Sequence, residues 1–358
     1  MKYLARNFES VDIMLGTECN LGCRYCIQKY QKTPKLSDQI NEDIYGFLKQ
    51  ISDENPSEKP VHITFTGGEP TLQMDSIREI LRHTSDCRFT YSILTNGKLL
   101  DEQLVESFNE HHVGIHVSWD GKASSKTRGY DVMREKEDVL LLCDELMLNG
   151  VASAAAYPKD IFAGFEAFNR KYMKVHGYGC MGNINFVDDP GIPDRTLAKI
   201  DEKRVYDDMY ELTLSALTEL DEESVTRKFI MEYLQSLDKK VAKGEPYDMF
   251  RGCGGGYVQL NLDLAGNLYE CHNTFVKAGD IYTPYFKYLS SVVASDCALP
   301  KRSECRGCVA EFICHDACAA GACRLTRKDD GVLAEKCKTM KAAARGIIQA
   351  TLDASEGK

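Results

Sequence analysis

The sequence lacks the features that mark secreted, membrane-spanning or nucleic-acid-binding proteins. Its first residues, MKYLARNFESVDI, contain no apolar run as long as that of a signal peptide. No part of the 358 residues has the roughly 18 consecutive apolar residues that a membrane helix needs. Basic residues are in the minority, 44 Lys and Arg against 54 Asp and Glu, and the net charge of −10 disfavours nucleic acid and anionic membranes as partners. We therefore expect a soluble, cytoplasmic protein.

Cysteine is the residue that the sequence has in excess. The odd number of cysteines, 15, argues against a protein in which every cysteine forms a disulfide. In a reducing compartment cysteines stay as thiols, which bind metals or act in catalysis. Three of them, Cys87, Cys143 and Cys180, are scattered and are typical of small buried residues. The others form two dense groups that need a chemical explanation, one at 19–26 and one at 253–337.

Apolar runs alternate with amphipathic segments between residues 10 and 190, which predicts βαβ units and a parallel sheet. The expected strands are 11–16, 61–67, 89–96, 113–121, 151–157 and 183–189, and the expected helices are 37–53, 74–84, 101–111 and 133–149. Six units are too few for a closed eight-stranded barrel. We therefore expect a partial (β/α)6 barrel of the α/β class, with its chemistry at the C-terminal ends of the strands.

The rest of the chain has a different character. Residues 196–243 are charged and helix-favouring, and they predict two or three helices. A β-hairpin with its turn around Gly266 comes next, followed by a loop-rich, cysteine-rich segment that we expect metal to organise. The expected parts are a barrel domain at 8–195, a helical bridge at 196–245, a cysteine-rich domain at 246–345 and a tail at 346–358.

The stretch GTECNLGCRYC places Cys19, Cys23 and Cys26 within eight residues. Thiolates hold iron–sulfur clusters, and three of them leave one iron of a four-iron cluster open to a substrate or cofactor. A zinc site that borrows a distant fourth ligand is the alternative. The C-x3-C-x2-C spacing, with Tyr25 before the last cysteine, resembles the signature of the radical S-adenosylmethionine (SAM) superfamily.

This resemblance implies an activity, a cofactor and a reductant. In the superfamily the amino and carboxylate groups of SAM chelate the open iron. An electron from the cluster then splits SAM into methionine and a 5′-deoxyadenosyl radical, which abstracts hydrogen from the substrate. A reductant such as flavodoxin or ferredoxin is expected to supply that electron.

Other segments resemble the SAM-binding loops of the same superfamily. TFTGGEPTL, with Gly67, Gly68, Glu69 and Pro70, follows the second expected strand as the GGEP loop does, and that loop contacts the SAM amino group. Glycine allows close backbone approach, and a carboxylate can meet an ammonium. The resemblance also implies that Ser118 reaches the SAM ribose.

Three further residues near strand ends are candidates for SAM binding. Asn96 lies in LTNG, Asp120 lies in VSWDG, and Arg128 follows shortly after. Arg128 either pairs with the SAM carboxylate or is a solvated surface arginine.

The C-terminal cysteines resemble the seven-cysteine pattern of the SPASM domain. The spacing is Cys253-x12-Gly266-x4-Cys271, then Cys305-x2-Cys308-x5-Cys314-x3-Cys318, then Cys337. SPASM domains follow the barrel in peptide-maturing enzymes and usually carry two auxiliary [4Fe–4S] clusters, so three clusters are implied. The resemblance assigns Cys305, Cys308, Cys314 and Cys337 to the outer cluster and Cys253, Cys271 and Cys318 to the inner one. A zinc ribbon is the alternative, but one zinc needs fewer cysteines.

The inner cluster is expected to lack a protein ligand. Family members often have another cysteine shortly after the first, whereas CGGGYVQL has none there. Cys297 or Cys323 could fill the place, as could water or a substrate thiolate. His272 stands where related sulfatase-maturing enzymes have a proton-accepting carboxylate. A neutral imidazole could act as that base near neutral pH, or it could support the cluster through a hydrogen bond.

The leading hypothesis is a radical SAM/SPASM enzyme that matures a ribosomally made peptide. It would abstract hydrogen from one residue and form a thioether, carbon–carbon or ether crosslink, with the auxiliary clusters accepting an electron. The alternatives are an anaerobic sulfatase-maturing enzyme that forms formylglycine, a dehydrogenase or epimerase, and a non-enzymatic iron–sulfur carrier or sensor. Because the first strand begins near residue 10, we expect no leader-binding domain at the N-terminus. A leader peptide would then be bound by a separate protein, or no protein would be needed to bind it.

Overall fold

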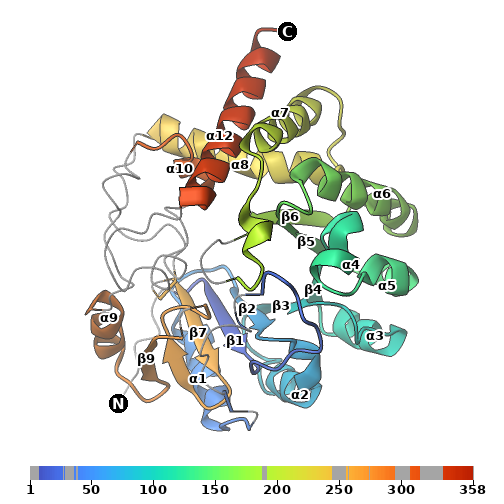
Figure 1. Ribbon diagram of the computed structural model, residues 1–358. Helices are drawn as coiled ribbons and strands as arrows, with labels where there is room; N and C mark the ends of the chain where they lie inside the picture. The colour runs from blue at the N-terminus through green and yellow to red at the C-terminus, as the bar shows by residue number, and fades with distance from the viewer. Residues whose placement is uncertain are drawn as a thin grey trace.

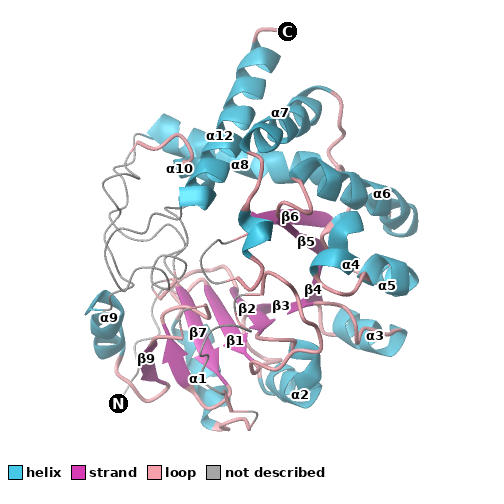
Figure 2. Cartoon of the chain, in the orientation of Figure 1, coloured by secondary structure: helices cyan, strands magenta, loops and turns pink. Residues whose placement is uncertain are grey.

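The computed structural model describes residues 8–26, 28, 36–37, 39–187, 192–243, 255–256, 258–273, 275–294, 307–314 and 334–357 (Figure 1). Strands lie at the centre and helices lie around them (Figure 2). Within these ranges one nine-stranded sheet has the order β6-β5-β4-β3-β2-β1-β7-β8-β9. The α/β class predicted from the sequence is confirmed.

The parallel part of the sheet consists of the strands β1 to β6. Their bounds are β1 (Ser10–Met14), β2 (Val61–Thr66), β3 (Phe89–Thr95), β4 (Val113–Ser118), β5 (Leu146–Ala152) and β6 (Met181–Phe186). Each strand pairs in parallel with the next, as βαβ units require. In the described sheet β6 is a terminal strand and does not pair with β1, so the barrel is open, as predicted.

Helices connect these strands and cover the outside of the sheet (Figure 1). The longer ones are α1 (Asp43–Glu54), α2 (Met74–His83), α3 (Glu102–Glu110), α5 (Val132–Leu140) and α6 (Pro158–His176), and the short turns are η1 (Pro70–Gln73), η2 (Gly121–Ala123) and α4 (Ser124–Thr127). Local chemistry sets their ends. Asp101 caps α3 by accepting a 2.8 Å bond from the Leu104 N–H, and Gly177 ends α6 with a φ of 79°.

The secondary-structure prediction is wrong around β5, and the helix predicted at 37–53 begins only at Asp43. The helix predicted at 133–149 ends at Leu140, and the strand predicted at 151–157 begins earlier, at Leu146. The segment LLCDELML is rich in residues that favour a helix, which explains the error. Two leucines of β5 instead pair with buried residues of β4, so tertiary packing overrides the local preference.

Side chains alternate between two very different faces of the sheet. The outer face of β1 and β2 carries Val11, Ile13, Ile63 and Phe65, which are fully buried in the core. The inner face is polar, and it carries Asp12, His62, Thr64, Ser92 and His116. A polar inner face is suited to holding a polar ligand.

Two histidines of the inner face are kept neutral. His62 Nδ1 lies 2.9 Å from Thr90 Oγ1, and its Nε2 lies 2.8 Å from Ser92 Oγ. Burial lowers the pKa of His62. Burial also lowers the pKa of His116 to about 4, with a further contribution from His62. Both imidazoles are therefore uncharged at pH 7.

The remaining elements follow the barrel strands. They are η3 (Arg195–Ala198), α7 (Glu202–Thr218), α8 (Val225–Lys243), β7 (Gln259–Asp263), β8 (Asn267–Tyr269), β9 (Lys277–Asp280), α9 (Tyr285–Ala294), α10 (Glu311–Cys314) and α12 (Ala334–Ser355). The helices predicted within 196–243 are confirmed as α7 and α8. The segment 346–358, expected as a tail, is helical as far as Ser355.

The strand β7 extends the barrel sheet instead of starting a new one. It pairs in parallel with β1, and Asp12 lies opposite Asn261. The predicted hairpin is confirmed, since β7 and β8 pair antiparallel and Gly266 has a φ of 84° in the turn. The buried Asp263 stabilises this turn by accepting a 2.8 Å bond from the Asn267 N–H.

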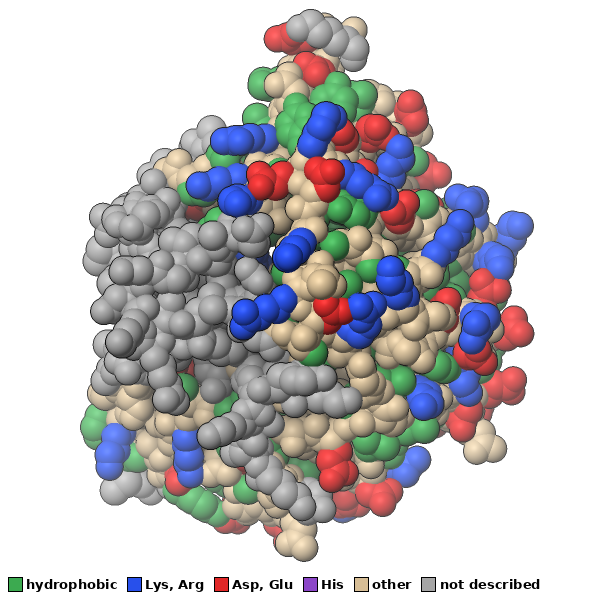
Figure 3. Space-filling view, in the orientation of Figure 1, with side chains coloured by type: hydrophobic (Ala, Val, Ile, Leu, Met, Phe, Trp, Pro, Cys, Tyr) green, Lys and Arg blue, Asp and Glu red, His purple; other side chains and the backbone are tan. Residues whose placement is uncertain are grey.

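Charged side chains of both signs are interspersed over the helices of the face shown in Figure 3. Neither sign dominates the described part of that face. No helix in the described ranges combines the length and the apolar character needed to cross a membrane.

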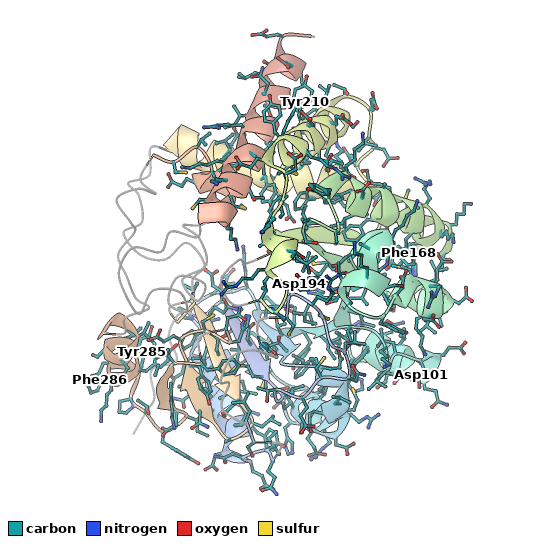
Figure 4. The ribbon with its side chains drawn as sticks, viewed as in Figure 1. Asp101, Phe168, Asp194, Tyr210, Tyr285 and Phe286 are labelled. Atoms are coloured by element: carbon teal, nitrogen blue, oxygen red, sulfur yellow. The ribbon has the colours of Figure 1, made fainter. Side chains whose placement is uncertain are left out.

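The last helix, α12, lies along α7 (Figure 1). The Tyr210 hydroxyl donates a 2.9 Å hydrogen bond to Asp353 (Figure 4). At Gly346 the two backbones approach so closely that an added Cβ would lie 2.5 Å from the Tyr206 carbonyl oxygen. A glycine is therefore required at this contact.

We predict that Gly346→Ala destabilises the protein by about 1–3 kcal/mol, because the new methyl group must push α12 away from α7. Gly46→Ala is the matched control. Gly46 is an exposed glycine of α1, and a Cβ added there would have nothing within 4 Å, so the same change should raise stability by about 0.5–1 kcal/mol. Thermal unfolding midpoints of both variants measure this. A Gly346→Ala midpoint at or above that of the wild type would contradict the packing argument.

Candidate functional site

The cysteines at 19, 23 and 26 lie in the loop after β1, at the C-terminal end of the sheet. All three are free thiols. The loop is held by a 3.1 Å bond from the Cys26 N–H to the Cys23 carbonyl and a 2.8 Å bond from the Arg24 N–H to the Thr127 carbonyl. Among the described residues, no three Cys, His, Asp or Glu side chains converge closely enough to hold a single metal ion.

The three thiols are nevertheless within electrostatic range of one another. Burial raises the pKa of Cys23 to about 11, Arg128 opposes this rise, and the other two thiols add to it. A four-iron cluster is larger than one ion and spaces its thiolate ligands further apart. Neighbouring thiols that do not converge on one point therefore fit such a cluster better than a zinc ion.

The GGEP loop packs directly against the start of the cysteine loop. The Gly68 N–H donates a 3.0 Å bond to the Gly16 carbonyl, and the Glu69 N–H donates a 2.8 Å bond to the Glu18 carbonyl. A Cβ at Gly68 would lie 2.1 Å from the Glu18 oxygen, and one at Gly67 would lie 2.5 Å from the Gly16 oxygen. Because Gly67 and Gly68 have no side chain, the backbone that precedes the cysteines can pack directly against them.

The Glu69 carboxylate is buried and joins the ends of β2 and β3. Its Oε1 accepts bonds from the Thr71 N–H (3.1 Å), the Thr71 hydroxyl (2.6 Å) and the Thr95 hydroxyl (2.6 Å). Its Oε2 accepts a 2.8 Å bond from the Asn96 N–H and has room for a second donor. Pro70 begins the short helix η1 that follows.

Asn96 contacts the cysteine loop from the end of β3. Its Nδ2 donates a 2.8 Å bond to Asn20 Oδ1 and lies 3.8 Å from Cys19 Sγ. The Nδ2 of Asn20 is buried and has no partner among the described residues. Asn96 therefore orients this end of the loop.

Asp120 is the centre of a buried network after β4. Its Oδ2 accepts bonds from the hydroxyls of Tyr25 (2.5 Å) and Thr127 (2.6 Å). Its Oδ1 accepts bonds from Arg128 Nη2 (2.8 Å) and the Val151 N–H (2.9 Å). Each of the two Asp120 oxygens thus accepts two bonds, which occupies both of its lone pairs. Asp120, which we expected to be near SAM, thus binds protein groups and positions Tyr25 and Arg128.

Arg128 is a buried cation and not a solvated surface arginine. Its side chain is 8% exposed, and its guanidinium lies 5.3 Å from the centre of the Tyr25 ring. Burial disfavours the charge, but the ion pair with Asp120 outweighs it and the pKa of Arg128 is raised. Its Nε is buried and has no partner among the described residues. A carboxylate ligand would satisfy this donor.

Ser118, the remaining residue predicted to contact SAM, is half-buried at the end of β4. It pairs across the sheet with Asn149 of β5. The Asn149 Nδ2 is buried, with no partner in the described part of the chain. Ser118 and Asn149 therefore lie next to each other, and Ser118 is at the C-terminal end of β4, where the SAM site is expected.

Asp194 supports the site and was not found from the sequence. It forms an ion pair with Arg24 of the cysteine loop and lies just before η3 (Figure 4). Its backbone N–H also donates a 3.1 Å bond to the Arg24 carbonyl. A small apolar cluster of Tyr25, Ile192 and Leu197 lies in the same region. The segment after β6 is thereby fastened to the cysteine loop.

Four of the seven SPASM-type cysteines lie in the described residues. Cys271 follows β8, Cys308 lies just before α10, Cys314 ends α10, Cys337 lies in α12, and all four are half-buried. The helices α10 and α12 contact each other. The predicted ligands Cys253, Cys305 and Cys318 lie outside the described residues, as do Cys297 and Cys323.

His272 contacts a carboxylate that sequence reasoning missed. Its Nδ1 lies 2.8 Å from Oδ2 of the buried Asp12 in β1. The available signal was a single acidic residue inside the apolar strand VDIML. The dyad joins the first strand of the barrel to the segment that follows Cys271.

Comparison with known proteins agrees with this geometry. Residues 13–140 match the family model described as the Radical SAM superfamily. The radical SAM cyclopropyl synthase TigE of Paramaledivibacter caminithermalis is 24% identical over 127 residues, which cover 31% of this chain and 27% of TigE. The chain spans about a third of the length of the curated relatives it matches.

Solved structures resemble a larger part of the chain. The sulfatase maturase anSMEcpe, solved with AdoMet and the Cp18Cys peptide, has a TM-score of 0.68 at 17% identity and covers 98% of this chain and 99% of its own. SuiB of Streptococcus suis, solved with its precursor peptide SuiA, has a TM-score of 0.59 at 15% identity and covers 89% and 74%. At these identities the likeness shows a common fold. The part of the chain that matches the Radical SAM superfamily, residues 13–140, contains the cysteine loop, the GGEP loop and Arg128.

Proposed function

We propose that this protein is a radical SAM enzyme that abstracts a hydrogen atom from one residue of a peptide and joins that residue to another in a crosslink. The observation that carries the proposal is the three-thiol loop beside Arg128, whose buried Nε has no partner among the described residues. The likeness to anSMEcpe and SuiB, both solved with a peptide, supports a peptide as the substrate.

The residues around the loop have separate roles in holding SAM. Cys19, Cys23 and Cys26 hold the cluster, and Arg128 binds the SAM carboxylate through its Nε. Glu69 Oε2 has room to accept a bond from the SAM amino group, and Ser118 meets the ribose. When bound, SAM and the cluster supply a 5′-deoxyadenosyl radical. Asp120 keeps Arg128 and Tyr25 in place before SAM arrives, so little ordering is left to occur on binding.

The C-terminal cysteines hold two auxiliary [4Fe–4S] clusters in this proposal. Cys308, Cys314 and Cys337 belong with Cys305 to the outer cluster, and Cys271 belongs with Cys253 and Cys318 to the inner one. Joining two residues removes two hydrogens from the peptide. One would leave as a hydrogen atom, and the other as a proton, for which His272 would be the acceptor, and an electron, for which an auxiliary cluster would be the acceptor. A flavodoxin or ferredoxin supplies the electron that starts the reaction, and a separate leader-binding protein is a candidate partner.

Formation of formylglycine is the second candidate function. The likeness to anSMEcpe over 98% of the chain favours it. His272 replaces the expected proton-accepting carboxylate, but its contact with Asp12 places an acid next to the base. Both functions use the same sites, but one joins two residues in a crosslink and the other oxidises a single Cys or Ser.

Co-expression with a short reading frame beside the gene, followed by mass spectrometry of the peptide, tests the proposed function. Loss of two hydrogens together with a crosslinked fragment pattern is expected. Conversion of one Cys or Ser to formylglycine would instead establish the second candidate. Deuterium uptake without loss of mass would indicate an epimerase, and an unmodified peptide would exclude that peptide as the substrate.

Arg128→Lys should weaken SAM binding by roughly 10- to 100-fold, because lysine keeps the charge but loses the Nε donor that faces the ligand. Equilibrium binding of SAM to the reconstituted protein measures the change. Arg134→Lys is the matched control, since Arg134 is 72% exposed and pairs with the neighbouring Glu135. Equal SAM affinities in wild type and Arg128→Lys, with unchanged unfolding midpoints, would remove Arg128 from the site.

Cys19→Ala should lower the iron content of the anaerobically reconstituted protein from about twelve to about eight atoms per chain, because one of three four-iron clusters is lost. Cys87→Ala is the control and should leave the content unchanged, since Cys87 lies beside Asp86 and away from the loop. A wild-type content of about four irons would contradict the auxiliary clusters. An unchanged content in Cys19→Ala would contradict the N-terminal cluster.

A further inference from the structure

A pocket of about 300 Å³ lies at the N-terminal ends of β4, β5 and β6, at the end of these strands opposite the SAM site. Its wall includes Gly114, His116, Met147 and Met181. Strand pairing places His116 beside Met147 and Met147 beside Met181, so these side chains form a row on the inner face of the sheet. The volume is at the lower end of the range for ligand pockets, which suits a single side chain.

The carboxylate of Glu145 lines this pocket on the inner face of the sheet. A Cβ added at Gly114 would point to the same face as the His116 side chain, and it would lie 3.3 Å from Glu145 Oε2. Burial lowers the pKa of His62, while the charges of Asp12 and Glu145 oppose this change, so Glu145 acts electrostatically on the inner face. The missing side chain at Gly114 therefore leaves the room that the Glu145 carboxylate occupies.

The negative charge of Glu145 is not paired within the described part of the chain, where its carboxylate has no hydrogen bond or ion pair. The ammonium of Lys228 lies next to the pocket wall at Gly179, but it is paired with Glu223 at 2.8 Å. The imidazole of His116 is neutral, because burial lowers its pKa to about 4. The pocket therefore presents a negative charge and a neutral imidazole to any ligand that enters it.

The apolar wall and the charge together favour one kind of occupant. The flexible thioethers of Met147 and Met181 can pack along a hydrocarbon chain. The carboxylates of Glu145 and of Asp144, which also lines the pocket, can accept bonds from a cation at the end of that chain. Lys and Arg side chains combine these two parts. A metal ion is not favoured, since no three metal-binding side chains converge among the described residues.

The pocket begins next to the place that we assign to SAM. His116 precedes Ser118 by two residues on the same face of β4, a distance of about 7 Å along the strand. We propose that the pocket binds a Lys or Arg side chain of the peptide substrate and that Glu145 selects for its positive charge. This inference rests on the proposed function for the peptide as the source of the side chain. It adds a substrate preference that hydrogen abstraction does not itself require.

The first test needs no peptide and uses the full-length reconstituted protein. Nα-acetyl-lysine N-methylamide has a cationic side chain and uncharged ends, and its norleucine analogue has the apolar chain without the charge. Titrations followed by NMR of the probes should show that the lysine probe binds about tenfold more tightly, the size expected for a bond between charged partners. Glu145→Gln should remove this difference. Equal affinities of the two probes for the wild type, or no binding of the lysine probe, overturns the inference.

The control for this test is Glu106→Gln. Glu106 is an exposed carboxylate of α3 that does not line the pocket, so this variant should bind both probes as the wild type does. Unfolding midpoints of both variants should match that of the wild type. A full preference of Glu145→Gln for the lysine probe overturns the role of Glu145. Tighter binding of the free diamine cadaverine than of the lysine probe overturns the assignment to a peptide side chain.

The second test uses the peptide identified by co-expression and a double-mutant cycle. Each Lys or Arg of the peptide is replaced in turn by Met, and one replacement should lower the modified fraction about tenfold with the wild-type enzyme. That replacement should have no further effect with Glu145→Gln, since it removes the same contact. A modified peptide without Lys or Arg, or an additional loss with Glu145→Gln, overturns the inference and leaves the proposed function intact. If the wild type modifies no peptide, the proposed function fails, and the probe titration alone decides the inference.

Discussion

The two parallel pairings of β1 place the cysteine loop beside the GGEP loop and Asp12 beside the segment that follows β8. β1 lies between β2 and β7, so both of its edges are hydrogen-bonded. Its end leads into the cysteine loop, which packs on the glycines that follow β2. Its inner face presents Asp12 to the segment that follows β8. A register shift of one residue would turn Asp12 into the apolar core and Ile13 into the site, so the apolar pattern of this strand also fixes its chemistry.

Buried carboxylates organise the loops around the cysteines. Glu69 and Asp120 each accept four hydrogen bonds from protein groups. A carboxylate removed from water is costly unless such bonds replace its hydration, so each one strongly favours a single loop geometry. Glu69 joins the ends of β2 and β3. Asp120 joins the cysteine loop after β1 to the segment after β4 and to Val151 of β5.

The features that could be predicted from the sequence are those that depend on the spacing of residues along the chain. Apolar runs that alternate with amphipathic segments predicted the parallel sheet, which is confirmed. The cluster predicted from the short spacing of Cys19, Cys23 and Cys26 stays a prediction. Local preference failed at β5, where helix-favouring residues form a strand because β4 lies beside them. Asp12 was missed since its partner His272 lies 260 residues away and one acidic residue in a strand has no spacing to recognise. Asp120 was recognised as a site residue, but its role depends on four donors that only folding assembles.

The neutral histidines of the inner face make the fold sensitive to acid. His116 has a pKa of about 4 in the folded protein, against an ordinary value of 6.5. Between these values the unfolded chain binds a proton that the folded chain does not, so stability falls as the pH is lowered from 6.5 towards 4. The polar interior that is suited to a ligand near neutral pH thus lowers the resistance of the barrel to acidification.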